Sequence, residues 1–132
     1  MRYNGRMSPR AFIHTLQELV HTSKLYRRTS IASGVLLLAC VLLPVWRILP
    51  ISSDRPFIPL HYNVYMGVDE IGPWYDVFVL PGLGASLFFL NTVFQALLFK
   101  RERVLSIFFA LATLATEAVL LAAMVMIVLL NL

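Results

Sequence analysis

Charged residues are scarce in this chain: Asp, Glu, Lys and Arg make up 14% of its 132 residues, against about 25% in a typical soluble domain. Hydrophobic residues reach 59%, and the mean hydropathy is +0.78. A small chain exposes much of its surface and needs polar residues to stay in solution. The composition therefore excludes an ordinary soluble globule, and the many aliphatic residues exclude a disordered chain.

Cysteine is nearly absent, since Cys40 stands alone. One cysteine excludes an intramolecular disulfide and a thiolate metal cluster. The sequence also lacks a nucleophile triad, a phosphate-binding glycine loop and zinc-ligand spacing. Its basic residues are not interleaved with aromatics on a soluble face, as binding to nucleic acid would require. We therefore expect no enzyme activity, no cofactor, no metal site and no nucleic-acid partner.

Long apolar runs are what the sequence does have, at residues 31–49, 77–99 and 104–130. A helix needs about 20 mostly apolar residues to cross a bilayer, and each run meets that length. Without water to satisfy the backbone, such runs must be helical. The sequence predicts an all-α membrane protein: a three-helix membrane domain at 31–132, with an outer loop at 50–76, after a basic cytoplasmic segment at 1–30.

The basic residues are placed asymmetrically around these runs. Nine of the eleven precede the first run or separate the second from the third: Arg2, Arg6, Arg10, Lys24, Arg27, Arg28, Lys100, Arg101 and Arg103. Basic residues in short loops mark the cytoplasmic side of a membrane. We therefore expect a multi-pass protein of the cell membrane, with its N-terminus in the cytoplasm and its C-terminus outside.

The segment from Ser8 to Arg27 has the pattern of an amphipathic helix. Ser8 and Pro9 are typical of a helix start. Apolar residues then recur at helical spacing: Phe12, Ile13, Leu16, Leu19 and Val20. This pattern predicts a helix on the cytoplasmic membrane surface. The alternative is a helix packed against the bundle or against a partner.

The outer loop is rich in proline, glycine and aromatic residues, so we expect no single regular element there. Tyrosine and tryptophan favour the headgroup level of a bilayer. We expect a short strand or an extended stretch at residues 60–65, a turn at Gly67, and a short helical turn that begins at Asp69 and Glu70.

One motif in this region carries a resemblance to a known family. Pro59, His61, Tyr62 and Asn63 are followed by Gly67 and Asp69, and then by Leu80 and Pro81 at the start of a membrane helix. This order resembles the small membrane domain of unknown function found in Sdp-type peptide-toxin immunity proteins and in many uncharacterised bacterial membrane proteins. The match covers residues 59–98. The resemblance implies a protein of the bacterial envelope, with no established enzyme activity.

The loop holds the first group of candidate site residues: His61, Asn63, Gly67, Asp69 and Trp74. Asparagine and aspartate beside a turn bond the loop backbone, and a histidine can fix the loop to a helix end. We expect these residues to organise the loop. Two alternatives stay open: they bind a ligand or peptide, or imidazole and carboxylate bind a divalent metal.

The second group lies within the membrane: Glu117, Asn91 and Gln95. A carboxyl group at mid-membrane depth is costly and should face protein or water. We expect a hydrogen bond from Asn91 to Glu117 that links two helices. The alternatives are an oligomer contact and a proton or ion relay. Two pairs of small residues, Gly82 with Ser86 and Ala118 with Ala122, indicate where helices approach closely.

These observations favour a non-enzymatic small integral membrane protein. It would bind a partner protein or peptide through its outer loop, or act as a subunit of an envelope complex. Besides the lipid bilayer, we expect a protein partner or a second copy of the chain. The alternative function is an oligomeric small transporter or channel component that uses Glu117.

Overall fold

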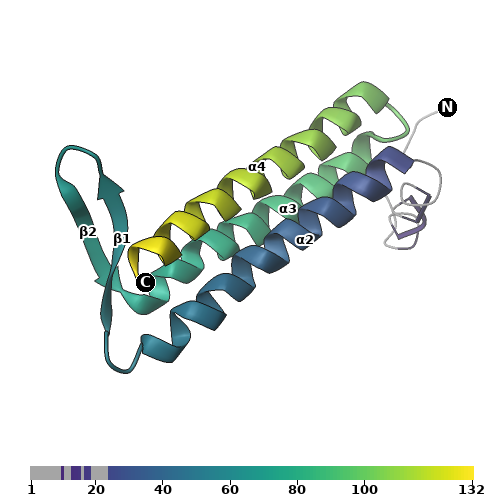
Figure 1. Cartoon of the computed structure of the whole chain (residues 1–132). Helices are drawn as coiled ribbons and strands as arrows, with labels where there is room; N and C mark the ends of the chain where they lie inside the picture. Colours follow the sequence, from purple (N-terminus) through teal and green to yellow (C-terminus); the bar gives the residue numbers. More distant parts are fainter. Residues whose placement is uncertain (1–9, 11–12, 16, 19–23) are drawn as a thin grey trace.

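The computed structural model describes residues 10, 13–15, 17–18 and 24–132. Three long helices form a bundle: α2 (Lys24–Arg47), α3 (Val79–Leu98) and α4 (Arg103–Leu130) (Figure 1). All three are long and apolar enough to cross a membrane, which confirms the predicted helices. Half of the residues of the expected amphipathic helix, namely 8–9, 11–12, 16 and 19–23, lie outside the described part of the chain.

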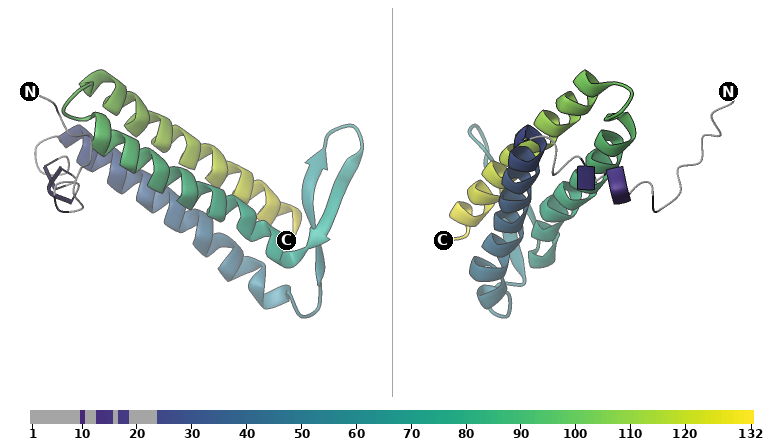
Figure 2. Two further views of the ribbon diagram at one scale, coloured as in Figure 1. Left: turned by 180° about the vertical axis from the view of Figure 1, so that it is seen from behind. Right: turned by 90° about the vertical axis from the view of Figure 1, so that its right-hand side faces the viewer.

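The helix α4 packs along both α2 and α3, which contact each other less (Figure 2). α2 and α4 run in the same direction, as two contacts show. Near their starts the Tyr26 hydroxyl donates to the carbonyl of Arg103 (3.4 Å), and further along Cys40 Sγ lies 3.9 Å from the carbonyl of Leu120. α3 runs the opposite way. The bundle therefore has two different ends. We call the end with the α3–α4 turn and Lys24 of α2 the turn end, and the opposite end, which carries a β-hairpin, the hairpin end.

The helix boundaries differ from the apolar runs mainly at the start of α2. The described part of this helix runs from Lys24 to Arg47 and passes through Pro44, so it already includes residues 24–30, ahead of the apolar run. Its first turns carry Lys24, Arg27 and Arg28, which are exposed. Lysine and arginine are good helix formers, so the helix continues beyond the apolar run. Hydropathy located the lipid-compatible part of the helix but not the helical turns at residues 24–30 that precede it.

The hairpin end contains a β-hairpin where we expected an irregular loop. Strand β1 (Phe57–Asn63) pairs antiparallel with β2 (Gly67–Pro73), with irregular register around His61. The expected extended stretch lies in β1 over most of its length, but the helical turn at Asp69 and Glu70 is wrong, because both residues lie in β2. Pairing with β1 satisfies the β2 backbone and overrides any local helical preference. The described part of the chain is therefore mainly helical, with one two-stranded sheet.

Two short 3-10 helices join the hairpin to the bundle, η1 (Leu49–Ile51) and η2 (Trp74–Phe78). The hairpin leaves the end of the bundle sideways and does not continue its long axis (Figures 1 and 2). Its base is part of the core. The hairpin-end cluster consists of buried residues from α2, η2, α4, β1 and the η1 junction: Cys40, Ile48, Ile58, Val77, Met124 and Val128.

A smaller apolar cluster closes the turn end, where Tyr26, Ala96 and Ala110 are buried. The Tyr26 ring meets the Phe99 ring edge to face, with centroids 5.4 Å apart. The middle and the turn-end half of the bundle also bury a polar set: Thr29, Ser33, Gln95, Ser106, Thr113 and Glu117. The bundle is thus fastened by apolar contacts at both ends and is polar along part of its axis.

Among the described helix glycines, Gly84 is the one packed against neighbouring helices, which the small-residue pairs did not indicate. A Cβ atom on Gly84 would lie 2.9 Å from Glu117 Oε2, 3.1 Å from Leu37 Cδ1 and 3.3 Å from Leu120 Cδ1. Gly82 has open space instead, and Ala118 and Ala122 are exposed. The predicted pairs are therefore wrong as contact sites.

We expect Gly84→Ala to lower the free energy of unfolding by about 1–3 kcal/mol, because the added methyl group overpacks the contact with α2 and α4. Gly82→Ala is the matched control. It has room for the methyl group and should change stability little or raise it, since alanine is the better helix former. Thermal unfolding of both variants in detergent measures the difference. Equal stability of the two variants would show that the packing around Gly84 is not tight.

Candidate functional site

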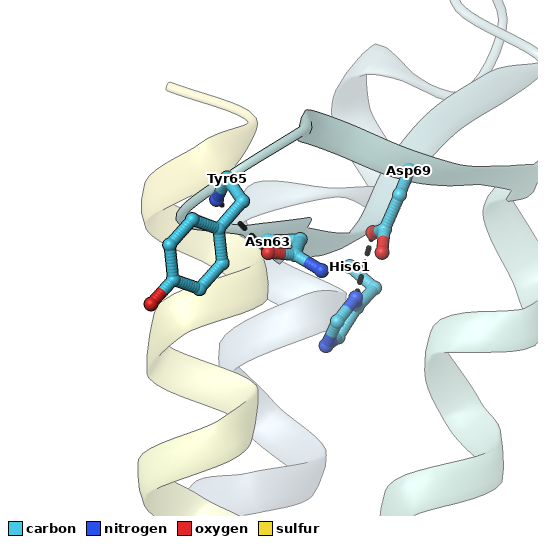
Figure 3. Close-up of polar contacts among 4 residues, drawn as sticks. All are labelled: His61, Asn63, Tyr65 and Asp69. Carbon is cyan, nitrogen blue, oxygen red and sulfur yellow. Dashed lines mark hydrogen bonds and ion pairs between the residues drawn. The ribbon is translucent and has the colours of Figure 1, made fainter.

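The histidine and aspartate of the loop motif meet across the hairpin. His61 on β1 places Nδ1 at 2.7 Å from Oδ1 of Asp69 on β2 (Figure 3). Their side chains are 61% and 31% exposed. An exposed pair of this kind contributes about 0–1 kcal/mol to stability. The two residues therefore bond each other, whereas we had expected them to bond the loop backbone.

Asn63 does organise the backbone, as expected. Its Oδ1 accepts a hydrogen bond from the Tyr65 amide at 2.9 Å, where the chain leaves β1 (Figure 3). Gly67 opens β2 with φ of +78°, in the left-handed region that glycine adopts without strain. These two residues set the ends of the connection 64–66, so the strands are joined by a short and defined turn.

Trp74 lies at the base of the hairpin. Its amide donates to the carbonyl of Pro56 at 3.1 Å, just beyond the last strand pair. Its half-buried ring packs against the hairpin-end cluster and meets the Phe78 ring edge to face, with centroids 6.4 Å apart. Trp74 therefore holds the hairpin to the bundle.

Asn131, which we did not select from the sequence, also holds the hairpin. Its Nδ2 donates to the carbonyl of Pro59 on β1 at 2.9 Å and to that of Ile127 on α4 at 2.8 Å. An asparagine near a chain end carries no sequence signal for such a role. This side chain ties the end of α4 to the middle of β1.

The connection between the strands is apolar and exposed. Val64, Tyr65 and Met66 are exposed by 84%, 96% and 80%. We call these three residues the hairpin tip. The anchored base and the exposed tip give the hairpin two chemically different ends.

The metal alternative finds little support. In the described part of the chain, no group of three or more His, Cys, Asp or Glu side chains could hold a metal ion. Glu70 is the register partner of His61, but the recorded side-chain contact of His61 is with Asp69. Two ligands make a poor site for zinc. The pair can instead hold the imidazole in one tautomer, with Nδ1–H donating to the carboxylate.

The intramembrane candidates do not connect as expected. The Asn91 amide donates to Thr113 Oγ1 at 3.0 Å, and the Thr113 hydroxyl donates in turn to the carbonyl of Phe109 at 2.7 Å. Glu117 is fully buried, and neither carboxyl oxygen has a hydrogen-bond partner. The predicted Asn91–Glu117 bond is therefore wrong, although Asn91 does link α3 to α4.

Gln95 is buried too, and its backbone carbonyl accepts a hydrogen bond from the Ser106 hydroxyl at 3.0 Å. Ser33 on α2 resembles Glu117, because its hydroxyl is buried without a partner. It lines a narrow crevice with Thr29, Thr92, Gln95 and Thr113, which has essentially no room for a water molecule. Single serines and threonines in an apolar run give no sequence signal of such a set.

A separate polar contact lies at the turn end. Lys100 Nζ lies 2.9 Å from Glu18 Oε2, and His14 Nδ1 lies 3.4 Å from Glu18 Oε1. The hydrogen bond from Lys100 lowers the pKa of the Glu18 carboxyl below its ordinary value. This contact brings the segment before α2 to the α3–α4 turn.

No protein-family model, no curated protein and no solved structure matches this chain. The resemblance to the domain of Sdp-type immunity proteins therefore stays a prediction that rests on residues 59–98. The functional argument depends on the geometry of the hairpin and of the buried polar set.

We expect Asn63→Ala to speed hydrogen exchange in the turn, because it removes the side-chain bond to the Tyr65 amide, worth about 0.5–1.5 kcal/mol. Asp69→Ala is the matched comparison and should change exchange less, since it breaks only an exposed pair. Exchange mass spectrometry over residues 60–74 measures both, with and without a chelator. If the chelator loosens the wild-type hairpin, a bound metal ion holds it together, and the roles assigned here are wrong.

Glu117→Leu should raise the free energy of unfolding by about 1–3 kcal/mol, because it removes a buried polar group that has no partner. Glu117→Gln should not give this gain, since its amide is equally unpartnered. Unfolding of both variants in detergent tests the expectation. Strong destabilisation by leucine would mean that the carboxyl group has a partner in the membrane.

Proposed function

We propose that this chain is a non-enzymatic integral membrane protein that binds a partner protein or peptide through its β-hairpin. The observation that carries the proposal is an anchored hairpin whose second strand, β2, has an exposed edge. Ile58 is fully buried in the hairpin-end cluster, and Trp74 and Asn131 fix the backbone on either side. A preformed binding element of this kind loses little conformational entropy when it binds.

The strands themselves indicate a binding mode. Within residues 24–132 the sheet has two strands. Asn131 and α4 contact β1, so β2 is the strand that keeps an unpaired edge. An unpaired edge is a template for an extended peptide, which adds as a third strand. On β2, residues 68–71 are all exposed.

The side chains of β2 indicate the chemistry of a partner. Val68 and Ile71 offer apolar contacts, and Asp69 and Glu70 offer negative charge. An extended segment with apolar and basic side chains would complement this strand. The resemblance to the immunity-protein domain is compatible with a peptide partner.

The proposal includes a place in the cell. The turn end carries Lys24, Arg27, Arg28, Arg101 and Arg103, all exposed, and the positive-inside rule puts such an end in the cytoplasm. The hairpin and the C-terminus then lie outside the cytoplasmic membrane of a bacterium. The hairpin would meet its partner from outside, or within a complex of the envelope.

Glu117 favours a second function, as a component of a small oligomeric transporter or channel. A buried carboxyl group without a partner is the feature that a proton or ion relay would use. A relay needs several such groups in sequence. Glu117 is the one Asp, Glu, Lys or Arg between residues 104 and 130, so partner binding remains the preferred proposal.

Photo-crosslinking in intact cells tests partner binding. A crosslinking residue at Ile71 on β2 should give a discrete adduct with a second protein. The same residue at Val119 on α4 is the control, because Val119 is similarly exposed (68% against 66% for Ile71) but lies on a lipid-compatible helix. Reversing the charges with Asp69→Lys and Glu70→Lys should strongly reduce the adduct. Absence of an adduct from Ile71, or equal adducts from both sites, would contradict the proposal.

A further inference from the structure

We propose that the hairpin tip, Val64, Tyr65 and Met66, inserts into the outer leaflet of the membrane, so that the hairpin lies along the bilayer surface. The occupant of this apolar surface is lipid, at the boundary between headgroups and acyl chains. The inference rests on the membrane placement given in the proposed function. It does not depend on the existence of a protein partner.

The first observation is the chemistry of the tip. Its three successive side chains are apolar or amphipathic and almost fully exposed, by 80–96%. Apolar side chains gain free energy when they leave water, about 25 cal/mol per Å² of buried apolar surface. Tyrosine is the residue that favours the headgroup level, where its ring is buried and its hydroxyl stays hydrated. The tip therefore matches the boundary region of a bilayer.

The second observation is that the Tyr65 amide and the His61–Asp69 pair, all near the tip, are bonded within the hairpin. The Tyr65 amide donates to Asn63 Oδ1 at 2.9 Å, so this backbone group does not depend on water. The nearest ionisable side chains, His61 and Asp69, bond each other at 2.7 Å. An internal bond lowers the cost of bringing a polar group close to lipid. The His61–Asp69 pair contributes little to stability. Its role is instead to lower the cost of placing these two side chains close to lipid.

The third observation is the direction of the hairpin. It projects to the side of the bundle, as the views in Figures 1 and 2 agree. A hairpin that continued the bundle axis would place its tip far out in water. A hairpin anchored at the helix ends and directed sideways keeps its tip close to the bilayer surface.

Aromatic residues at the helix ends indicate where that surface lies. Trp46 is exposed at the end of α2, and the Arg47 guanidinium lies 4.3 Å from the centre of its ring. Tyr75, also exposed, lies at the start of the segment that leads into α3. Tryptophan and tyrosine are enriched at the membrane–water boundary. The base of the hairpin thus lies at the membrane–water boundary.

Fluorescence in lipid vesicles tests the insertion without any partner present. In a Cys40→Ala background, Tyr65→Cys carries an environment-sensitive label, and Ser53→Cys carries the same label as the control. Ser53 is exposed and lies before β1 in the chain. A thiol reagent that cannot cross membranes should first label Ser53→Cys from outside sealed cells, which checks the side of the hairpin.

We expect the label at position 65 to emit at shorter wavelength and to be quenched several-fold more strongly by lipids spin-labelled near the headgroup than the label at position 53. Val64→Asn with Met66→Asn should remove most of this difference. Quenching of both sites by aqueous iodide to the same extent would overturn the inference. It would also be overturned if protection at position 65 appears only at high protein-to-lipid ratio, which would assign the tip to a second copy of the chain. Either result leaves the crosslinking test of the partner intact.

Discussion

The whole structure depends on one buried stripe along α4. Its buried residues recur at every third or fourth position, with one longer step: Ser106, Ala110, Thr113, Glu117, Met124 and Val128. This spacing keeps one face of the helix between α2 and α3. In lipid there is no hydrophobic force to drive helices together, so association relies on close packing and on hydrogen bonds between helices. The stripe supplies packing and hydrogen bonds. Its small and polar residues lie toward the turn end, and its large apolar residues lie toward the hairpin end.

The polar residues of this stripe are of two kinds: some form hydrogen bonds to α3, and one has no hydrogen-bond partner. Ser106 and Thr113 bond to α3 through Gln95 and Asn91. Glu117 has no such bond, and Gly84 allows its carboxyl group to lie against the backbone of α3. The apolar clusters at the two ends hold the helices together around this group. The fold therefore accommodates the buried Glu117 side chain, but no hydrogen bond in the structure explains why a carboxyl group stands at this position.

The sequence predicted the helices well because lipid compatibility is a property of composition, which can be read from one run at a time. The hairpin could not be predicted in the same way. Asp69 and Glu70 have no strong local preference for a strand, and the pairing of β2 depends on β1 several residues away. The Asn91–Glu117 bond failed because spacing along one helix shows which residues share a face, not which residue of another helix that face meets. Gly84 and Asn131 were missed because the neighbours that give them a role lie on other elements.

The hairpin and the interior of the bundle are packed together, because α4 contacts both. The stripe that contains Glu117 continues to Met124 and Val128, which pack in the same cluster as Ile58 of β1. Beyond the end of α4, Asn131 bonds Pro59 and Ile127 together. A hairpin held by both side-chain packing and a hydrogen bond cannot change its direction unless α4 moves with it. The free part of the hairpin is therefore restricted to its distal half, where the His61–Asp69 pair and the tip lie, and the tip is the part that we propose to contact lipid.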